Sequence, residues 1–397
     1  MLDSIIDEVD GRRIRIGQHW LVDFASCNYL GFDLDAEIIG AIPDYLDRWG
    51  THPSWSRHLA SPALYGEIEQ ELTELLGVED TLLFPTITHI HMSVIPVLAG
   101  EGSIFLDGRA HKTIYDGCVT ARGLGATVER FPHNDLEALE SELARSAASR
   151  RLIVTDGVNS MTGNAPDISA LTSLAKEYDA LLYVDDAHGF GVIGERGAAE
   201  PCDYGLRGNS VVRHQDVTYD NLILIGGFSK AYSSLLAFIA GPSKLKQLLK
   251  TAASPYIYSG PSPVASLATA LEGLRANQRK GDLLRREVHR LTHRVLDRLT
   301  ELDIATPNES GYPIIEFSLV DADEIDEAGD YLFERGVYVT IASYPIVPKQ
   351  EVGFRVQLTA ANTDAEVDHL NTVLGELAER FPLRTREPSA PFADGAR

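Results

Sequence analysis

The chain has 397 residues, of which 44% are hydrophobic and 23% charged, so it is long enough for a large globular domain and a smaller one. Its 58 acidic and 35 basic residues give a formal net charge of −23, which argues against nucleic acid or an anionic membrane as a main partner. Three scattered cysteines, Cys27, Cys118 and Cys202, form neither a disulfide framework nor a CxxC metal pair.

The N-terminal stretch carries early acidic residues and has no long apolar core, which is not typical of a signal peptide. No apolar run approaches the roughly 20 residues that a membrane span requires. Together with the sparse cysteines, this predicts a cytoplasmic protein without a membrane segment.

The first expected elements are two helices, over residues 34–48 and 66–77, the second ending on Gly77. Short apolar runs then alternate with helical stretches such as Asp135–Ala147 and Ile168–Tyr178. The expected strands are Thr81–Phe84, Ser103–Leu106, Arg151–Thr155, Leu181–Val184 and Asn221–Ile225. Buried strands separated by helices indicate an α/β fold with a mainly parallel sheet between layers of helices.

After a helical region over Pro263–Leu299, the pattern changes to that of a small α+β domain. Its expected strands are Ile314–Leu319, Val337–Ile341 and Phe354–Leu358, followed by a closing helix over Asp364–Arg380. The predicted organisation is an N-terminal segment (1–45), a large domain (46–275), a small domain (276–383) and a flexible tail (384–397).

Ligands of open α/β sheets bind beyond the carboxyl ends of the strands, and two such ends carry chemically useful residues. The strand LLYVD ends in Asp185, an acid that could keep a pyridine nitrogen protonated or could simply cap a helix. The strand NLILIGG is followed by Phe228, Ser229 and Lys230. Taken alone, Lys230 could be an amine nucleophile or, more commonly, a surface lysine.

An acid at one strand end and a G-x-S-K about 45 residues later resemble the fold-type I pyridoxal-phosphate (PLP) enzymes, and most of all the α-oxoamine synthase family. The resemblance extends from about Val22 to about Leu377. It implies a large PLP-binding domain with a mainly parallel sheet, a small C-terminal α+β domain, and a Schiff base between PLP and Lys230.

The resemblance also implies roles for residues in the first third of the chain. Asn28 and Tyr29 match the N-Y-L-G segment near the substrate, and Arg57 matches the arginine of a G-S-R segment, also on the substrate side. The FPTITHIHMS segment matches a loop and helix N-terminus that binds the cofactor phosphate through Thr86, Ile87 and Thr88, a general property of helix N-termini.

Further motifs imply the groups around the cofactor ring. LDGRAHKTIYDG places His111 on the ring face, and DGVNSMTG places Ser160 near the phenolic oxygen or the substrate. VDDAHGFGVIGERG gives Asp185 to the ring nitrogen and His188 to the phenolic oxygen.

The remaining implied residues bind the phosphate of the cofactor and the carboxylate of the substrate. Ser229 lies beside Lys230, and Ser259 would reach the phosphate in the active site of a neighbouring subunit. Arg355, in the C-terminal block, would bind the substrate carboxylate, for which a planar guanidinium is suited.

The sequence departs from the family pattern at several positions. Phe228 stands where the family has a threonine that binds the phosphate, and His52–Trp55 replaces a glycine-rich stretch that shapes the acyl-side pocket. Asn362 replaces a histidine, and Asp186 replaces a glutamate. An H-x-H pair, His89 and His91, is also absent from the pattern; without a third ligand at clear spacing, we interpret it as structural or substrate-side and predict no metal site.

The resemblance implies a decarboxylative condensation of a small amino acid with an acyl thioester, carried on coenzyme A or a carrier protein, to give an α-amino ketone. The catalytic residues would be Lys230, His111, Asp185 and His188. An aminotransferase, an aldolase or a PLP-dependent cyclisation catalyst remains open, because part of the pattern is common to fold-type I enzymes. A homodimer with shared active sites is expected.

Overall fold

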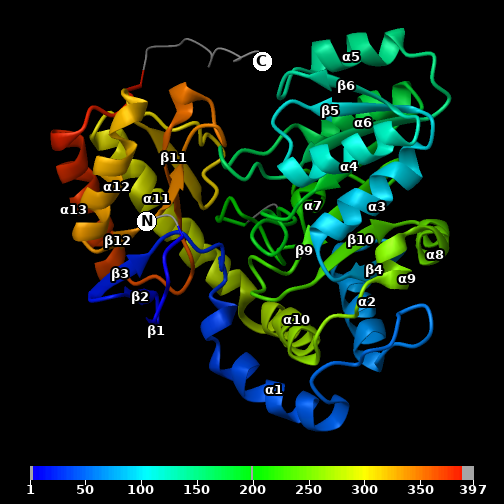
Figure 1. Cartoon of the computed structure of the whole chain (residues 1–397), viewed down its shortest axis with the longest axis horizontal. Helices are drawn as coiled ribbons and strands as arrows, with labels where there is room; N and C mark the ends of the chain where they lie inside the picture. Colours follow the sequence, from blue (N-terminus) through cyan, green and yellow to red (C-terminus); the bar gives the residue numbers. More distant parts are fainter. Residues whose placement is uncertain (1–2, 198–199, 387–397) are drawn as a thin grey trace. The chain divides into compact units, whose positions relative to one another are not determined.

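The computed structural model describes residues 3–197 and 200–386 (Figure 1). The chain divides into two compact units. The large unit comprises Asp35–Asn159 and Ala165–Leu283, and the small unit comprises the residues up to Leu34, Ser160–Asn164 and the residues from Leu284 onward. The small unit is therefore assembled from three separate segments of the chain.

A seven-stranded sheet forms the centre of the large unit, in the order β4-β10-β9-β8-β7-β5-β6. The strands are β4 (Asp80–Phe84), β5 (Ser103–Asp107), β6 (Thr127–Phe131), β7 (Arg151–Asp156), β8 (Leu181–Asp185), β9 (Leu222–Gly227) and β10 (Ala237–Gly241). Only β10 runs against its neighbours, and the pairs from β9 to β6 are parallel. The predicted mainly parallel sheet is confirmed.

Every residue of β5, β9 and β10 is buried, so both faces of the sheet are covered, as expected for continuous apolar strands. The helices of the large unit are α1 (Ala36–Trp49), α2 (Ala63–Leu76), α3 (Ile87–Ala99), α4 (Lys112–Gly123), α5 (Leu136–Arg145), α6 (Ile168–Glu177), α7 (Val211–His214), α8 (Ser243–Ala252), α9 (Ser254–Tyr258) and α10 (Val264–Ala276). One face packs against α3, α4 and α8 in a continuous apolar core.

The small unit holds two sheets, β1-β2-β3-β12 and β11-β14-β13. Its strands are β1 (Glu8–Asp10), β2 (Arg13–Ile16), β3 (His19–Asp23), β11 (Ile314–Ser318), β12 (Val337–Tyr338), β13 (Thr340–Ala342) and β14 (Gly353–Gln357). A π-helical turn (Asn277–Gly281) precedes α11 (Asp282–Glu301), which leads into the unit, and α12 (Ile325–Glu334) and α13 (Asp364–Arg380) complete its helices. Short 3-10 turns lie at η1 (Phe32–Leu34), η3 (Ala322–Glu324) and η4 (Lys349–Glu351). The core of the unit joins α11, α12 and α13 to β11, β12 and β14 (Figure 1).

Most elements lie where the sequence predicts them, and local signals explain their ends. Asp35 caps α1, which continues through Pro43. Gly77 ends α2 in a left-handed conformation, and Thr363 and Glu366 form a capping box at the start of α13.

Two sequence expectations are corrected by the fold. The strand expected over Val337–Ile341 is two short strands in different sheets, since β12 pairs with β3 and β13 pairs with β14. In addition, β6 and β10 were not expected as strands; the outer strand β6 is mostly exposed and therefore lacks an apolar run.

Of the predicted tail over residues 384–397, positions 387–397 lie outside the described residues. Arg384 and Arg386 form backbone hydrogen bonds with the small unit. Within the described part of the chain, no helix is both long and apolar enough to cross a membrane.

Candidate active site

Three buried aspartates mark one edge of the large sheet. Asp107 ends β5, Asp156 ends β7 and Asp185 ends β8, and these three strands are adjacent. Because the strands are parallel, their carboxyl ends meet at the same edge. Asp156 and Asp185 are paired directly in the strand register. Burying several carboxyl groups together is costly unless each one has partners, so this edge is where chemistry is expected.

Asp185 is held by two donors. Its Oδ2 lies 3.0 Å from Nε2 of His91, and its Oδ1 accepts a hydrogen bond from the backbone N–H of Ala187 at 3.1 Å. Burial alone would raise the pKa of Asp185, but His91, Lys230 and His111 together lower it below its usual value. Asp185 is therefore expected to be ionised, and the amine of Lys230 and the ring of His111 are near enough to stabilise its charge.

Asp156 has the opposite character. Burial, reinforced by the negative charge of Asp185, raises its pKa well above the usual value. Its Oδ1 accepts the backbone N–H of His111 at 3.2 Å, and its Oδ2 accepts the Asn159 amide at 3.3 Å. Asp156 thus anchors the segment that presents His111, which is the N-terminal cap of α4.

Asp107 supports the same segment from the other side. Its Oδ1 accepts the backbone N–H of Arg109 at 2.8 Å and lies 2.9 Å from Nδ1 of His133. The short loop between β5 and α4 is therefore fixed at both ends, which keeps His111 at the edge of the sheet.

The N-terminus of α3 approaches the end of β9 closely. Thr86 caps α3 by accepting the backbone N–H of His89 at 3.3 Å. A Cβ on Gly227 would lie 2.6 Å from Cδ1 of Ile87, so a larger residue there would force the Ile87 side chain to move. Ile87 and Thr88 occupy the first turn of α3, where free backbone N–H groups favour an anion.

Phe228, which replaces the expected threonine, points into the core. Its ring lies 5.1 Å from Tyr232, 5.7 Å from Phe190 and 6.0 Å from Phe238, all centroid to centroid. The position is therefore used for packing. Of the neighbouring residues, Ser229 is exposed and Lys230 is half-buried.

Two other predicted cofactor residues are in the large unit. His188 is buried just beyond β8, three residues after Asp185. Ser259 is half-buried after α9, and its hydroxyl donates to the carbonyl of Gly260 at 3.2 Å.

All three nitrogens of the Arg57 guanidinium have partners within the large unit. Its Nη2 pairs with Glu69 at 3.1 Å, its Nη1 donates to the carbonyl of Leu83 at 2.7 Å, and its Nε donates to Ser61 at 3.3 Å. The guanidinium carbon also lies 3.8 Å from the Tyr65 ring centroid. This arrangement joins the loop before α2 to β4.

The other predicted substrate residues belong to the small unit. Arg355 donates from Nη1 to the carbonyl of Ser160 at 2.8 Å, so Ser160 groups with Arg355. The Nε of Arg355 is buried and has no hydrogen-bond partner among the described residues.

Tyr29 and Asn28 lie in the same unit. Burial raises the pKa of Tyr29 well above its usual value, although the charge of Arg355 opposes that shift. Asn28 donates to Asp33 at 3.0 Å, and Asp33 also pairs with Arg12. The backbone N–H of Ala360, just beyond β14, donates to the carbonyl of Tyr29 at 2.7 Å, and Gln357 at the end of β14 donates to the carbonyl of Phe24 at 2.8 Å.

Sequence reasoning missed the roles of Asp156 and His91. His91 lies on the apolar face of α3 with Ile90, Val94 and Ile95, and all four are buried. A polar ring on an apolar helix face requires a buried partner, and this signal was available in the sequence. No group of three or more potential metal ligands occurs in the described part of the chain.

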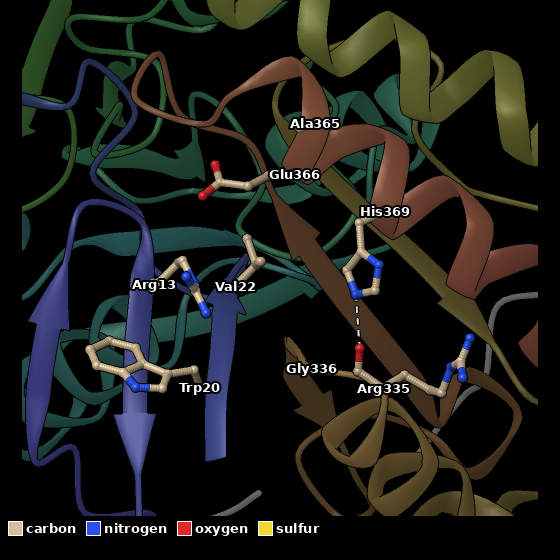
Figure 2. Close-up of a pocket in the computed structure, with 8 residues that line it drawn as sticks. All are labelled: Arg13, Trp20, Val22, Arg335, Gly336, Ala365, Glu366 and His369. Atoms are coloured by element: carbon tan, nitrogen blue, oxygen red, sulfur yellow. Dashed lines mark hydrogen bonds between the residues drawn. The ribbon is translucent and has the colours of Figure 1, made fainter. Parts of the chain in front are cut away.

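A separate cavity of about 370 Å³ lies in the small unit (Figure 2). Figure 2 shows Arg13 beside Trp20, with Glu366 and His369 on the facing helix. His369 already bonds the carbonyl of Arg335 at 2.8 Å, and Glu366 accepts the backbone N–H of Thr363. Because its polar groups serve the fold and the three aspartates lie in the other unit, this cavity is not the candidate active site.

The sequence matches the aminotransferase class I and II family over residues 21–374. It is 33% identical to an 8-amino-7-oxononanoate synthase from Dechloromonas aromatica, with 94% of each chain covered. The fold is similar to that of a serine palmitoyltransferase from Sphingomonas wittichii, at 27% identity and a TM-score of 0.86, over 95% of this chain and 92% of the other. A serine palmitoyltransferase from S. paucimobilis has a TM-score of 0.87 at 24% identity, over the same shares of both chains.

These findings confirm the predicted fold class, the fold-type I architecture of PLP-dependent transferases. The relatives and the structural neighbours both carry the names of α-oxoamine synthases. The chain therefore belongs to the aminotransferase class I and II family, within its branch of PLP-dependent α-oxoamine synthases.

Proposed function

We infer that this protein is a PLP-dependent acyltransferase that condenses a small amino acid with an acyl thioester and releases carbon dioxide. The observation that carries this proposal is the ionised, buried Asp185, held by His91 and facing Lys230 and His111. An anionic carboxylate, an amine and an aromatic ring at one edge of a sheet suit the pyridine nitrogen, the aldehyde and the ring face of PLP.

The residues at this edge fit the cofactor. Lys230 would hold it covalently and Asp185 would bind its ring nitrogen. The phosphate would lie at the N-terminus of α3, next to Gly227 at the end of β9. We propose the following further contacts: His111 on the ring face, His188 and Ser160 at the phenolic oxygen, and Thr86, Ile87, Thr88, Ser229 and Ser259 at the phosphate. When bound, PLP supplies an electron sink for the pair of electrons left on the amino-acid Cα.

The chain's own groups orient the reactants and move protons. Arg355, with its buried Nε donor, would bind the carboxylate of the amino acid. The Nζ of Lys230, once released, would take the proton from Cα. A new carbon–carbon bond then forms between Cα and the acyl carbon while the thioester C–S bond breaks and the thiol leaves. Carbon dioxide departs, and a proton returned to Cα gives the α-amino ketone.

The names of the relatives support this reaction class. 8-Amino-7-oxononanoate carries an amino group and an oxo group on neighbouring carbons, as an α-amino ketone does. Serine palmitoyltransferase is named for transferring an acyl group to an amino acid. Asn28, Tyr29 and Arg57 are proposed to lie on the substrate side, although the three nitrogens of Arg57 already have partners in the large unit.

The direct test is a mass-spectrometric assay that crosses glycine, alanine and serine with a panel of acyl thioesters. We expect the purified protein to be yellow, and we expect carbon dioxide and free thiol to appear only when both substrates are present. Lys230→Ala should lose both the visible absorbance and the activity while remaining folded.

The matched control is Lys250→Ala, a lysine near the end of α8 that should leave the absorbance and the activity unchanged. Amino-group transfer to a keto acid without release of carbon dioxide would instead indicate an aminotransferase. A colourless protein that ignores added PLP would refute the proposal.

We also propose a homodimer that acts in the cytoplasm. Exposed apolar side chains in the large unit support the dimer: Trp55, Leu59 and Tyr258 are 51, 77 and 82% exposed. Their two segments are linked by a bond from Ser56 Oγ to Ile257 O at 2.6 Å, so the three residues form one surface, the dimer patch. The cytoplasmic location is supported by the three cysteines, all of which are free thiols.

A further inference from the structure

A buried line of three side chains runs through the large unit behind the candidate cofactor site. Tyr183 on β8, His91 on α3 and Asp185 at the end of β8 are at most 4% exposed. The Tyr183 hydroxyl lies 3.0 Å from Nδ1 of His91, and Nε2 of His91 lies 3.0 Å from Oδ2 of Asp185. His91 is one of the two histidines of the H-x-H pair that the family pattern does not contain.

The chemistry of the two outer groups assigns the hydrogens of the imidazole. Burial and the charge of Asp185 raise the pKa of Tyr183 well above its usual value, so its hydroxyl keeps its proton and donates to Nδ1. The carboxylate of Asp185 can only accept, so Nε2 carries the hydrogen that faces it. Tyr183 thereby selects the one neutral tautomer that can donate to Asp185.

Close packing keeps this geometry in place. A Cβ on Gly117 of α4 would lie 2.4 Å from the carbonyl oxygen of His91, so α4 presses against α3 at this residue. This contact fixes the backbone of His91, and the bonds to Tyr183 and Asp185 at 3.0 Å fix its ring. The donor is therefore pre-positioned, which reduces the entropic cost of the hydrogen bond.

We propose that His91 is a positioning residue that keeps the Asp185 carboxylate ionised and aimed, and so determines that the pyridine nitrogen of bound PLP carries a proton. Two arrangements of one proton compete at such a contact: a carboxylate beside a protonated ring nitrogen, or a neutral carboxylic acid beside an unprotonated one. The His91 donor stabilises only the first, because it donates to a carboxylate more strongly than to a neutral acid. This inference rests on the proposed PLP-dependent function and assigns a role within its site.

Other charged and titratable groups face this contact from every neighbouring element. Lys230 and His111 favour the ionised form of Asp185, whereas the like charge of Asp185 raises the pKa of Asp156. The full set is Lys230 after β9, His111 before α4, Asp156 on β7, Asp107 on β5, Asp186 after β8, Tyr183 on β8 and Cys118 on α4. Among them, Lys230 loses its free amine when it binds the cofactor, so His91 is the side chain that continues to donate a hydrogen bond to Asp185, beside the backbone N–H of Ala187.

The test measures the proton itself. Holoenzyme is loaded with PLP labelled with ¹⁵N in the ring, and the ¹⁵N chemical shift is recorded at neutral pH for the wild type, His91→Phe, His91→Asn and Tyr183→Phe. We expect a protonated ring in the wild type and a shift toward the unprotonated value in His91→Phe. His91→Asn should lie between them, since an amide can restore a neutral donor. Tyr183→Phe, which leaves the tautomer free, should move the shift in the same direction by a smaller amount.

A second readout is the affinity for PLP, which should weaken by about 10- to 100-fold in His91→Phe, the worth of a hydrogen bond to a charged group. His214→Asn is the matched control, because this histidine bonds the carbonyl of Gly194 in the same unit and should change neither readout. Tyr183→Phe removes one oxygen only, so it keeps the test decisive if His91→Phe fails to fold. Ring shifts that stay at the wild-type value in His91→Asn and Tyr183→Phe would overturn the inference, whereas failure of the wild type to release carbon dioxide would count against the proposed function alone.

Discussion

At the scale of single residues, neighbouring aspartates on adjacent strands are pushed toward opposite protonation states. Asp185 has three cationic or donor neighbours, whereas Asp156 accepts two neutral donors and the charge of Asp185 outweighs the influence of Lys230 on it. Burial raises the pKa of both, so the neighbours decide which one stays ionised. The site thus holds a carboxyl group with a lowered pKa, proposed to face the ring nitrogen, beside one with a raised pKa that anchors the His111 segment.

The raised pKa of Asp156 predicts a specific pH dependence of stability. Below the unfolded pKa of about 3.9, the carboxyl is neutral in both states; above it, the unfolded chain ionises while the folded one does not. The contribution of Asp156 is therefore complete at low pH and is lost as the pH rises toward its folded pKa. We expect Asp156→Asn, which cannot ionise, to reduce the loss of stability of the cofactor-free protein between pH 4.5 and 7.5, by about 1.4 kcal/mol for each unit of the shift.

Urea unfolding of the cofactor-free protein at several pH values measures this effect. Glu177→Gln, at an exposed acid on α6, should leave the pH profile parallel to that of the wild type. A profile of Asp156→Asn that also runs parallel to the wild type would show that Asp156 ionises equally in both states.

Arg57 illustrates how a motif match and a structural environment can point to different roles. The motif suggests a substrate contact, but each nitrogen of the guanidinium already has a partner, in Glu69, Leu83 or Ser61. We expect Arg57→Ala to lower the free energy of unfolding by about 1.5–3 kcal/mol, because the buried Glu69 loses one of its two cationic partners while it keeps Lys246, at 3.0 Å. The KM for the amino acid should then change little in the folded fraction.

The measurement combines urea unfolding with steady-state kinetics. Glu69→Gln provides the companion variant, since it removes the charge from the same pair and should also destabilise the protein. A large increase in KM for Arg57→Lys with full stability would instead place Arg57 at the substrate.

At the scale of elements, the neighbouring strands determined strand pairing and direction, which the local sequence does not specify. Residues 337–342 are apolar and β-prone throughout, yet they divide between two sheets because β3 takes Val337–Tyr338 and β14 takes Thr340–Ala342. Similarly, β10 runs antiparallel between β9 and β4, an arrangement that strand periodicity does not encode. Gly117 is required for the close approach of α4 to the backbone of α3, and Gly227 leaves room for the side chain of Ile87.

At the scale of the whole molecule, the two units carry different parts of the proposed chemistry. The large unit holds the cofactor groups, and the small unit holds Arg355 with Ser160 and Tyr29. The segment Ser160–Asn164 belongs to the small unit although its neighbours in sequence belong to the large one. The domain boundaries predicted from the sequence were continuous, because a composition change along the chain cannot reveal a short excursion of this kind.

The proposed dimer gives a prediction at this scale. Tyr258→Arg places a charge on the dimer patch, so we expect the mass measured by light scattering to fall from that of two chains toward that of one. Val320→Arg, at an exposed apolar residue of the small unit, is the control of equal charge and should remain dimeric. A wild type that is monomeric at all concentrations would contradict the proposal.

The sequence by itself determined the fold class and the family, because ordered motifs at strand ends, from Asn28 to Arg355, record which residues must meet. It also predicted Lys230 and Asp185 as cofactor-binding residues, from their types and their spacing at two strand ends. The tertiary structure decided the surroundings of those groups: His91 bonds Asp185 and lowers its pKa, burial raises the pKa of Asp156, and Phe228 packs in the core. The physical reason is that protonation and packing depend on neighbours brought together from α3, β7, β8 and the loop after β9, and no local stretch of sequence contains those neighbours.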